Sequence, residues 1–278
     1  MGSLFGTRTR LRPVSEVVRE IATFKRFYYL LDDTVFGRQS TYAYYSELFD
    51  AIGALDKVNY WTGQANLDAA ATPEGREIVR KAANAGLIYA AVGMESINPA
   101  VMKKAGTLGK NGSKDPSEVL SRMKESIRFI QDQGIAVSGW FTIGYEEDRV
   151  ETFYDTLAFC REMSVIPILC PLEALPGTPL HSRLSAEGRV DPQKRINVVH
   201  PVMTDDDILG AMAECTKRGF SLRENFKRTR FYAKRFAAVR HQNNTDTRAK
   251  IEKTIFVWVL QSKVKKGIIG LAGPGPAS

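Results

Sequence analysis

Along residues 14–173, short apolar runs alternate with longer stretches in which apolar residues recur at helical spacing. Short apolar runs bounded by polar or glycine-containing turns predict buried strands. These runs lie at 26–33, 58–63, 87–93, 135–144 and 165–173. The stretches with helical spacing lie at 14–24, 40–55, 72–84, 98–104, 115–134 and 150–163. Strict alternation predicts an α/β fold, in which a parallel sheet forms a whole or partial barrel, or an open sheet, with helices outside.

Capping residues predict where three of the helices begin. Thr72 stands directly before a proline, which is typical of an N-cap followed by the first helical residue. Asp115 is followed three residues later by Glu118, and Thr204 by Asp207, which is the spacing of a capping box. The sequence therefore predicts helices that begin after Thr72, Asp115 and Thr204.

The helix predicted at 14–24 differs from the later ones because no strand precedes it. Every later helix in the alternation follows a predicted strand. We therefore expect a first strand upstream of this chain, which leaves 26–33 at the edge of the sheet. Parts of Phe27, Tyr29 and Leu31 should be exposed at such an edge.

The C-terminal region has a different composition from the alternating part. Residues 217–266 hold 15 Lys and Arg against 3 Asp and Glu, in a chain whose net charge is +8. Aromatic residues are interleaved with these cations at Phe226, Tyr232 and Phe236. We expect the three rings to pack on the barrel while the charges stay solvated. Contact with a membrane surface or with nucleic acid is the alternative.

Composition narrows the class of protein. With 278 residues and 44% hydrophobic content, the chain can bury a large core. We predict an α/β region over 1–190 and a helical basic region over 191–278. The apolar run at 254–260 is far shorter than the roughly 20 residues of a membrane span, and the N-terminus lacks the apolar segment of a signal peptide. The three cysteines are too scattered for a disulfide framework, so a reducing cytoplasm is expected.

Carboxylates and amides gather where the predicted strands end. The five ends read LLDDTVF, WTGQANL, VGMESIN, TIGYEED and PLEALPG. The carboxyl ends of parallel strands meet at one edge of the sheet, where α/β folds bind ligands. Any single residue of this set could simply cap the next helix. A ring of them suits a ligand with an amino group, ribose hydroxyls and an adenine edge.

Four stretches of the sequence, taken in order, resemble one enzyme family. They are YYLLDDTVF, VGMESINPAVMKKAG, GIAVSGWFTIGYEEDRVETFYDT and ALPGTPLHSRLSAEGR. Together they resemble radical S-adenosylmethionine enzymes, most closely those preceded by a cobalamin-binding domain. The resemblance implies a partial βα barrel that binds S-adenosylmethionine and a 4Fe–4S cluster and begins radical chemistry by reductive cleavage of S-adenosylmethionine. It further implies a small-molecule substrate, with cobalamin-dependent methyl transfer among the family's reactions.

The resemblance assigns S-adenosylmethionine contacts to residues at the strand ends. Those expected near its amino group, ribose and carboxylate are Asp32, Asp33, Glu95 and Ser96. Those expected around its adenine are Ile143, Gly144, Leu172, Glu173 and Ala174. Gln64, at the end of the strand predicted at 58–63, is also expected to contact the cofactor.

The sequence departs from the family at the cluster. It contains no CxxxCxxC motif, and Cys160, Cys170 and Cys215 are expected to be buried apolar residues. We therefore expect the cluster-binding and cobalamin-binding segments to lie upstream of this chain. On this hypothesis the chain is the C-terminal portion of a radical S-adenosylmethionine enzyme and is inactive as given. The alternative is a cluster-free, non-catalytic barrel that binds a small ligand or a protein partner.

Overall fold

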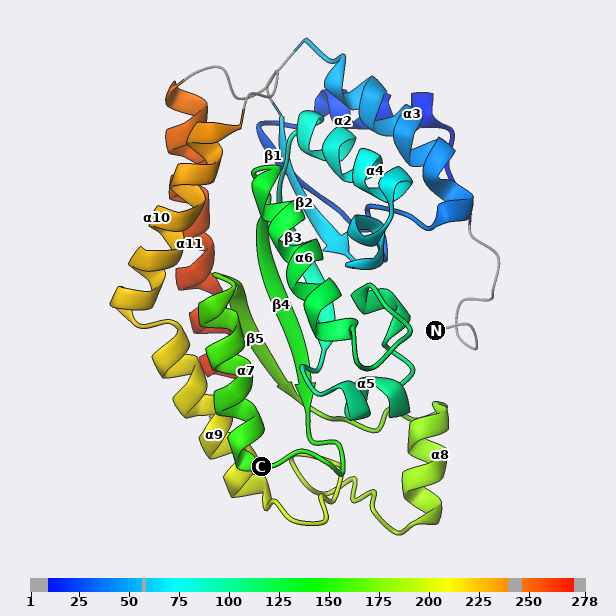
Figure 1. Ribbon diagram of the computed structural model, residues 1–278, viewed down its shortest axis with the longest axis vertical. Helices are drawn as coiled ribbons and strands as arrows, with labels where there is room; N and C mark the ends of the chain where they lie inside the picture. Colours follow the sequence, from blue (N-terminus) through cyan, green and yellow to red (C-terminus); the bar gives the residue numbers. More distant parts are fainter. Residues whose placement is uncertain (1–9, 57–58, 240–246, 273–278) are drawn as a thin grey trace.

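The structure is a computed structural model that describes residues 10–56, 59–239 and 247–272, with side chains up to residue 267 (Figure 1). At its centre lies a sheet of five parallel strands in the order β1-β2-β3-β4-β5. The strands are β1 (Phe27–Leu30), β2 (Tyr60–Ala65), β3 (Leu87–Glu95), β4 (Ala136–Ile143) and β5 (Ile166–Pro171). Each overlaps the apolar run predicted for it, so the predicted α/β fold with a parallel sheet is confirmed.

Helices connect the strands and continue after the last one. Those that alternate with the strands are α2 (Val14–Thr23), α3 (Tyr42–Gly53), α4 (Pro73–Asn84), α5 (Pro99–Lys104), α6 (Val119–Asp132) and α7 (Val150–Glu162). Those that follow β5 are α8 (Pro179–Ala186), α9 (Asp205–Gly219), α10 (Leu222–Ala238) and α11 (Thr247–Ala272). Short 3₁₀ turns lie at Gln39–Thr41, Asp68–Ala71 and Gly109–Asn111.

Two of the three predicted helix starts are confirmed. The Thr72 hydroxyl accepts a hydrogen bond from the Gly75 N–H at 3.1 Å, and Thr204 forms a capping box with Asp207. The start predicted after Asp115 is wrong, because α6 begins only at Val119. Asp115 instead accepts a hydrogen bond from the backbone N–H two residues later, which closes a turn before the helix.

One face of the sheet is buried under the helices that alternate with the strands. Figure 1 shows α4 and α6 lying over this face. Alternate strand residues such as Trp61, Val92 and Val137 join these helices in the main hydrophobic core. Because side chains alternate along a strand, the intervening residues point to the opposite face. We call that second side, which carries Tyr89, Ala136, Trp140 and Thr142, the open face.

The C-terminal helices cover the amino-terminal half of the open face. Phe256 of α11 stacks on Phe27 of β1 at a ring-centroid distance of 5.7 Å, and Val257 is buried beside Tyr89. Tyr232 of α10 is buried, and its hydroxyl accepts a hydrogen bond from the Val137 N–H at 3.1 Å. These contacts leave the carboxyl ends of the strands as the accessible part of the face. The domain boundary predicted at residue 190 stays a prediction.

The expected exposure along β1 is observed. Phe27, Tyr29 and Leu31 expose 47%, 41% and 89% of their surface. In the described part of the chain, β2 is the strand that pairs with β1, and none pairs with its other edge. An additional upstream strand and a closed or partial barrel stay predictions.

One expectation for the basic region is wrong. Tyr232 and Phe236 are buried as expected, but Phe226 is 61% exposed. Tyr232 and Phe236 are four residues apart, so their side chains lie on the same side of α10, which faces the sheet. Phe226 is six residues before Tyr232, and its side chain therefore points away from that side. Within the described ranges, none of the helices has the length and apolar content needed to cross a membrane.

Candidate functional site

The carboxyl ends of β2 to β5 form the accessible part of the open face. Gln64 of β2 is exposed, and Trp140 of β4 exposes 45% of its surface although it lies in a central strand. Trp140 pairs in register with Gly93 of β3, which has no side chain to cover the indole. An exposed tryptophan inside a sheet leaves apolar surface open to a ligand.

Glu95 is the most unusual residue at this edge. Its φ of +64° is in the left-handed region, which non-glycine residues rarely adopt, and the β3–β4 register shifts between Gly93 and Glu95. The strained backbone turns the carboxylate onto the open face. There it accepts hydrogen bonds from Lys110 Nζ at 2.5 Å and from Thr142 Oγ1 at 2.9 Å. Strain of this kind is concentrated at functional sites, so Glu95 is the centre of the candidate site.

Lys110 reaches Glu95 from the loop between α5 and α6. The loop is fixed to the segment after β2, because the Lys110 carbonyl accepts a hydrogen bond from the Leu67 N–H at 3.1 Å. The buried Asn111 side chain also donates to the Met94 carbonyl at 2.9 Å. The sequence shows only a loop rich in glycine and lysine here, so the role of Lys110 was not predicted.

The turn after β4 is held from two directions. The Gly144 and Tyr145 N–H groups each donate to Asp148 Oδ2 at 2.9 Å, and burial raises the pKa of Asp148. From the other side, His200 Nε2 donates to the Tyr145 carbonyl at 2.8 Å, since its Nδ1 accepts from the Met203 N–H. The His200 contact was not predicted from the sequence, because His200 lies far along the chain.

The segment after β5 lies directly against this turn. The Leu172 N–H donates to the Ile143 carbonyl at 2.9 Å, and a Cβ added at Gly144 would lie 3.1 Å from the Leu172 Cβ. Asn197 then holds Ala174 by both its N–H, at 2.9 Å, and its carbonyl, at 2.8 Å. Ile143, Gly144, Leu172 and Ala174 are therefore brought together as one rigid rim.

The remaining predicted residues have plainer surroundings. Asp32 accepts a hydrogen bond from the Tyr45 hydroxyl at 3.1 Å, while Asp33 and Glu173 are exposed. Ser96 is buried, and its hydroxyl accepts from the Asn98 N–H at 3.0 Å, as in a local turn. The ligand contacts assigned to all ten residues stay predictions.

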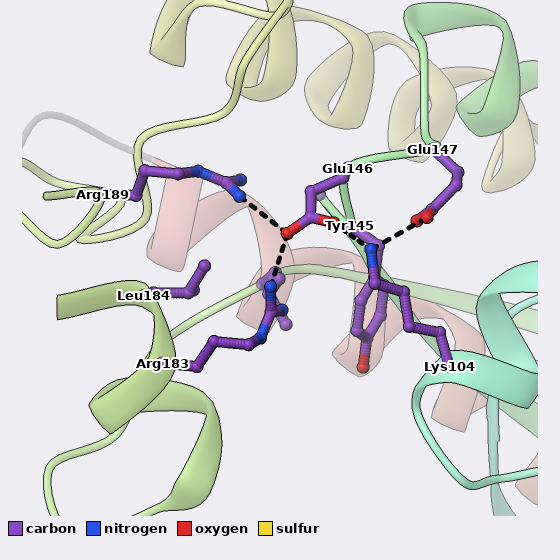
Figure 2. Close-up of a pocket in the computed structure, with 9 residues that line it drawn as sticks. Lys104, Tyr145, Glu146, Glu147, Arg183, Leu184 and Arg189 are labelled. Carbon is purple, nitrogen blue, oxygen red and sulfur yellow. Dashed lines mark hydrogen bonds and ion pairs between the residues drawn. The ribbon is translucent and has the colours of Figure 1, made fainter. Parts of the chain in front are cut away.

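A cluster of ion pairs closes the outer side of the rim (Figure 2). Glu146, in the turn after β4, pairs with Lys104 of α5, Arg183 of α8 and Arg189, the last two at 2.7 Å. Lys104 also contacts Glu147 at 3.0 Å. These cations lower the pKa of Glu146 to about 2. The cluster joins three separate segments of the chain through one carboxylate.

Glu146→Gln should lower the free energy of unfolding by about 1–2 kcal/mol near neutral pH. The pKa of Glu146 is lower in the fold than its ordinary value of 4.5, so its contribution is present above that value. The contribution is lost as the pH falls toward about 2, where wild type and variant should converge. Urea unfolding at both pH values measures this, with the exposed Glu47→Gln as the matched control. Equal losses in the two variants would show that the cluster adds no stability.

No family model matches the chain. The chain is 26% identical over 286 residues to the hopanoid C-2 methylase of Rhodopseudomonas palustris (strain TIE-1), covering 96% of this chain and 48% of that protein. It is 24% identical over 186 residues to the bacteriochlorophyllide d C-12(1)-methyltransferase of Chlorobaculum tepidum, covering 64% of this chain and 37% of that protein.

A solved structure shows the same fold. The cobalamin-dependent S-adenosylmethionine radical enzyme OxsB, with aqua-cobalamin and S-adenosylmethionine bound, superposes with a TM-score of 0.54 at 12% identity. The match covers 91% of this chain and 41% of OxsB. The chain therefore resembles two methyltransferases in sequence and a cobalamin-dependent radical S-adenosylmethionine enzyme in fold. It spans about half the length, or less, of the relatives that it matches.

The described residues of this chain do not fit a 4Fe–4S cluster. Within them there is no group of three or more His, Cys, Asp and Glu side chains able to hold a metal ion. Cys160 and Cys215 are buried in the hydrophobic core as expected, whereas Cys170 is only half-buried, and burial raises the pKa of Cys160 to about 12. Cluster ligation needs thiolates that converge on one site. His241 lies outside the described residues.

Proposed function

We propose that this chain supplies the S-adenosylmethionine-binding sheet of a cobalamin-dependent radical S-adenosylmethionine methyltransferase. The observation that carries the proposal is Glu95, held in a strained conformation with its carboxylate on the open face between Lys110 and Thr142. The carboxyl edge of a parallel sheet is where such folds bind ligands. The relationship to two carbon methyltransferases and the fold shared with OxsB support it.

The site offers complementary groups for each part of S-adenosylmethionine. Glu95 can accept hydrogen bonds from the ribose hydroxyls, and Lys110 beside it can attract the carboxylate of the methionine moiety. On this proposal the adenine lies beside the rim formed by Ile143, Gly144 and Leu172. Asp33, exposed after β1, can accept from the amino group.

The reaction of the whole protein is proposed from its relatives. Both curated relatives are named for methylation at a carbon position, C-2 in one and C-12(1) in the other. We therefore propose that the substrate is a small molecule methylated at carbon. The cluster and the cobalamin would be bound by segments upstream of this chain, and no step through them is assigned to the residues described. On this proposal the chain alone binds S-adenosylmethionine without cleaving it.

Calorimetric titration of the full 278-residue chain with S-adenosylmethionine tests the site. We expect weak binding, because the iron that would anchor the amino and carboxylate groups is not bound by these residues. Glu95→Gln and Lys110→Met should each weaken it about tenfold, since each removes a charged hydrogen-bonding partner. Glu47→Gln, an exposed carboxylate on α3, is the matched control. Sub-micromolar binding that persists in both site variants would place the ligand elsewhere.

The cluster-free hypothesis remains the second candidate. The donor set agrees with both candidates, because the described residues hold no converging ligands for a metal ion and the first candidate places them upstream. Two results would separate the candidates. An in-frame CxxxCxxC directly upstream in the gene would support the radical enzyme. If the chain does not bind S-adenosylmethionine and no such motif lies upstream, a non-catalytic binding barrel is supported.

A further inference from the structure

The outer side of α11 is apolar where solvent should favour polar residues. The four large side chains on it are Ile251, Ile255, Trp258 and Val259, exposed by 53%, 55%, 37% and 43%. Their spacing of four, three and one residues places them in one stripe of the helix. Exposed apolar stripes of this size on a soluble domain mark interaction surfaces.

This stripe is distinct from the side of α11 that packs on the sheet. Ala249, Lys253, Val257 and Gln261 are buried and follow one another at intervals of four. Gln261 is fixed by Arg228 of α10, whose Nε donates to its Oε1 at 2.7 Å. The helix is therefore locked in rotation, and the apolar stripe cannot turn inward.

Cations border the stripe. Lys263 and Lys266 are exposed within two turns of Val259, on the C-terminal side. Beside this end lies the start of α10, since Lys265 Nζ contacts the Phe220 carbonyl at 3.5 Å. That part of α10 exposes Leu222 and Phe226 together with Arg223 and Lys227. Trp258 and Val259 of α11 and the two apolar side chains of α10 thus lie near cations at this end of the helix pair.

We propose that α11 and the start of α10 bind the surface of an anionic lipid bilayer, with α11 lying flat in the interface. Apolar side chains would enter the acyl boundary, while the flanking lysines and arginines would contact lipid phosphates. Tryptophan is favoured at this boundary because its ring is apolar and its N–H is polar. The proposal does not depend on the S-adenosylmethionine site.

The charge pattern favours a bilayer over other partners. Two copies of this surface would bring Lys263, Lys266 and the cations of α10 together, and like charges oppose such a dimer. Nucleic acid would be attracted by the cations but would leave Ile251, Ile255 and Trp258 exposed to water. An anionic bilayer satisfies both the apolar stripe and the cations.

Co-sedimentation of the full chain with vesicles tests the proposal. We expect binding to vesicles of phosphatidylcholine mixed with phosphatidylglycerol, weakened by salt, and little binding to phosphatidylcholine alone. Lys263→Gln with Lys266→Gln should weaken binding by roughly fivefold for each lysine removed. The matched control is Lys103→Gln with Lys114→Gln. Both lysines are exposed, in α5 and in the loop before α6.

A second pair of variants tests the apolar contact. Ile255→Ser with Trp258→Ser should weaken vesicle binding at least about tenfold, while the exposed Val202→Ser should not. Both residues are solvent-facing, so circular dichroism should show an unchanged fold. The proposal is overturned if the wild-type chain does not sediment with anionic vesicles. It is equally overturned if the stripe variants bind as wild type, or if they only abolish self-association measured by light scattering.

Discussion

Replacing Trp61 with alanine is expected to lower the free energy of unfolding by about 3–5 kcal/mol. Trp61 of β2 is fully buried, stacks on Phe49 of α3 at a centroid distance of 5.4 Å, and donates its Nε1–H to the Ala85 carbonyl at 3.0 Å. Its removal leaves a cavity between the sheet and α3 and a buried carbonyl without its donor. Two costs of different origin therefore add.

The same substitution at a second tryptophan provides the control. Trp258 of α11 is 37% exposed and faces outward, so Trp258→Ala should cost less than about 1 kcal/mol. Urea unfolding followed by circular dichroism measures both variants. Similar losses in the two would mean that the layer between α3 and β2 is not the stable core that the burial indicates.

Replacing Gly144 with alanine is expected to cost about 2–4 kcal/mol and to abolish measurable binding of S-adenosylmethionine. Gly144 has a φ of +131°, which residues with a Cβ rarely adopt. The new Cβ would also lie 3.1 Å from the Leu172 Cβ. Either the turn after β4 or the segment after β5 must move. Both form the rim proposed to hold adenine, so stability and binding should fall together.

Gly177→Ala separates the backbone effect from the contact. Gly177 also has a positive φ, of +79°, but a Cβ there meets no atom within 4 Å. The variant should lose about 1–2 kcal/mol from the strained backbone and keep its affinity for S-adenosylmethionine. Denaturant unfolding and calorimetry on both variants give the comparison. Unchanged binding in Gly144→Ala would exclude the rim as the adenine site.

Hydrophobic periodicity and helix caps determined much of the fold. All five strands and the helices between them could be predicted, because strand and helix periodicities are read over neighbouring residues. The start predicted at Asp115 failed because its side chain closes a local turn instead of capping α6, an alternative with the same sequence signal. Phe226 was misplaced because an aromatic residue in a basic helix can face either side.

The candidate site was predictable only in outline. Polar residues at strand ends indicated the edge of the sheet at which we propose that the ligand binds, since parallel strands share one carboxyl edge. The conformation of Glu95 was not predictable, because its positive φ depends on the shift between β3 and β4. Lys110 was missed for a similar reason, since its loop carries no motif.

By itself, the sequence determined the alternation of strands and helices and the parallel sheet, through periodicity and local capping. Only the tertiary structure decided which distant groups meet there. His200 reaches Tyr145 and Arg189 reaches Glu146 across long stretches of chain, and α11 turns its apolar stripe outward because Gln261 is fixed to α10. Such contacts depend on how helices cross the sheet, and that packing is set by the fit of buried side chains from every element at once.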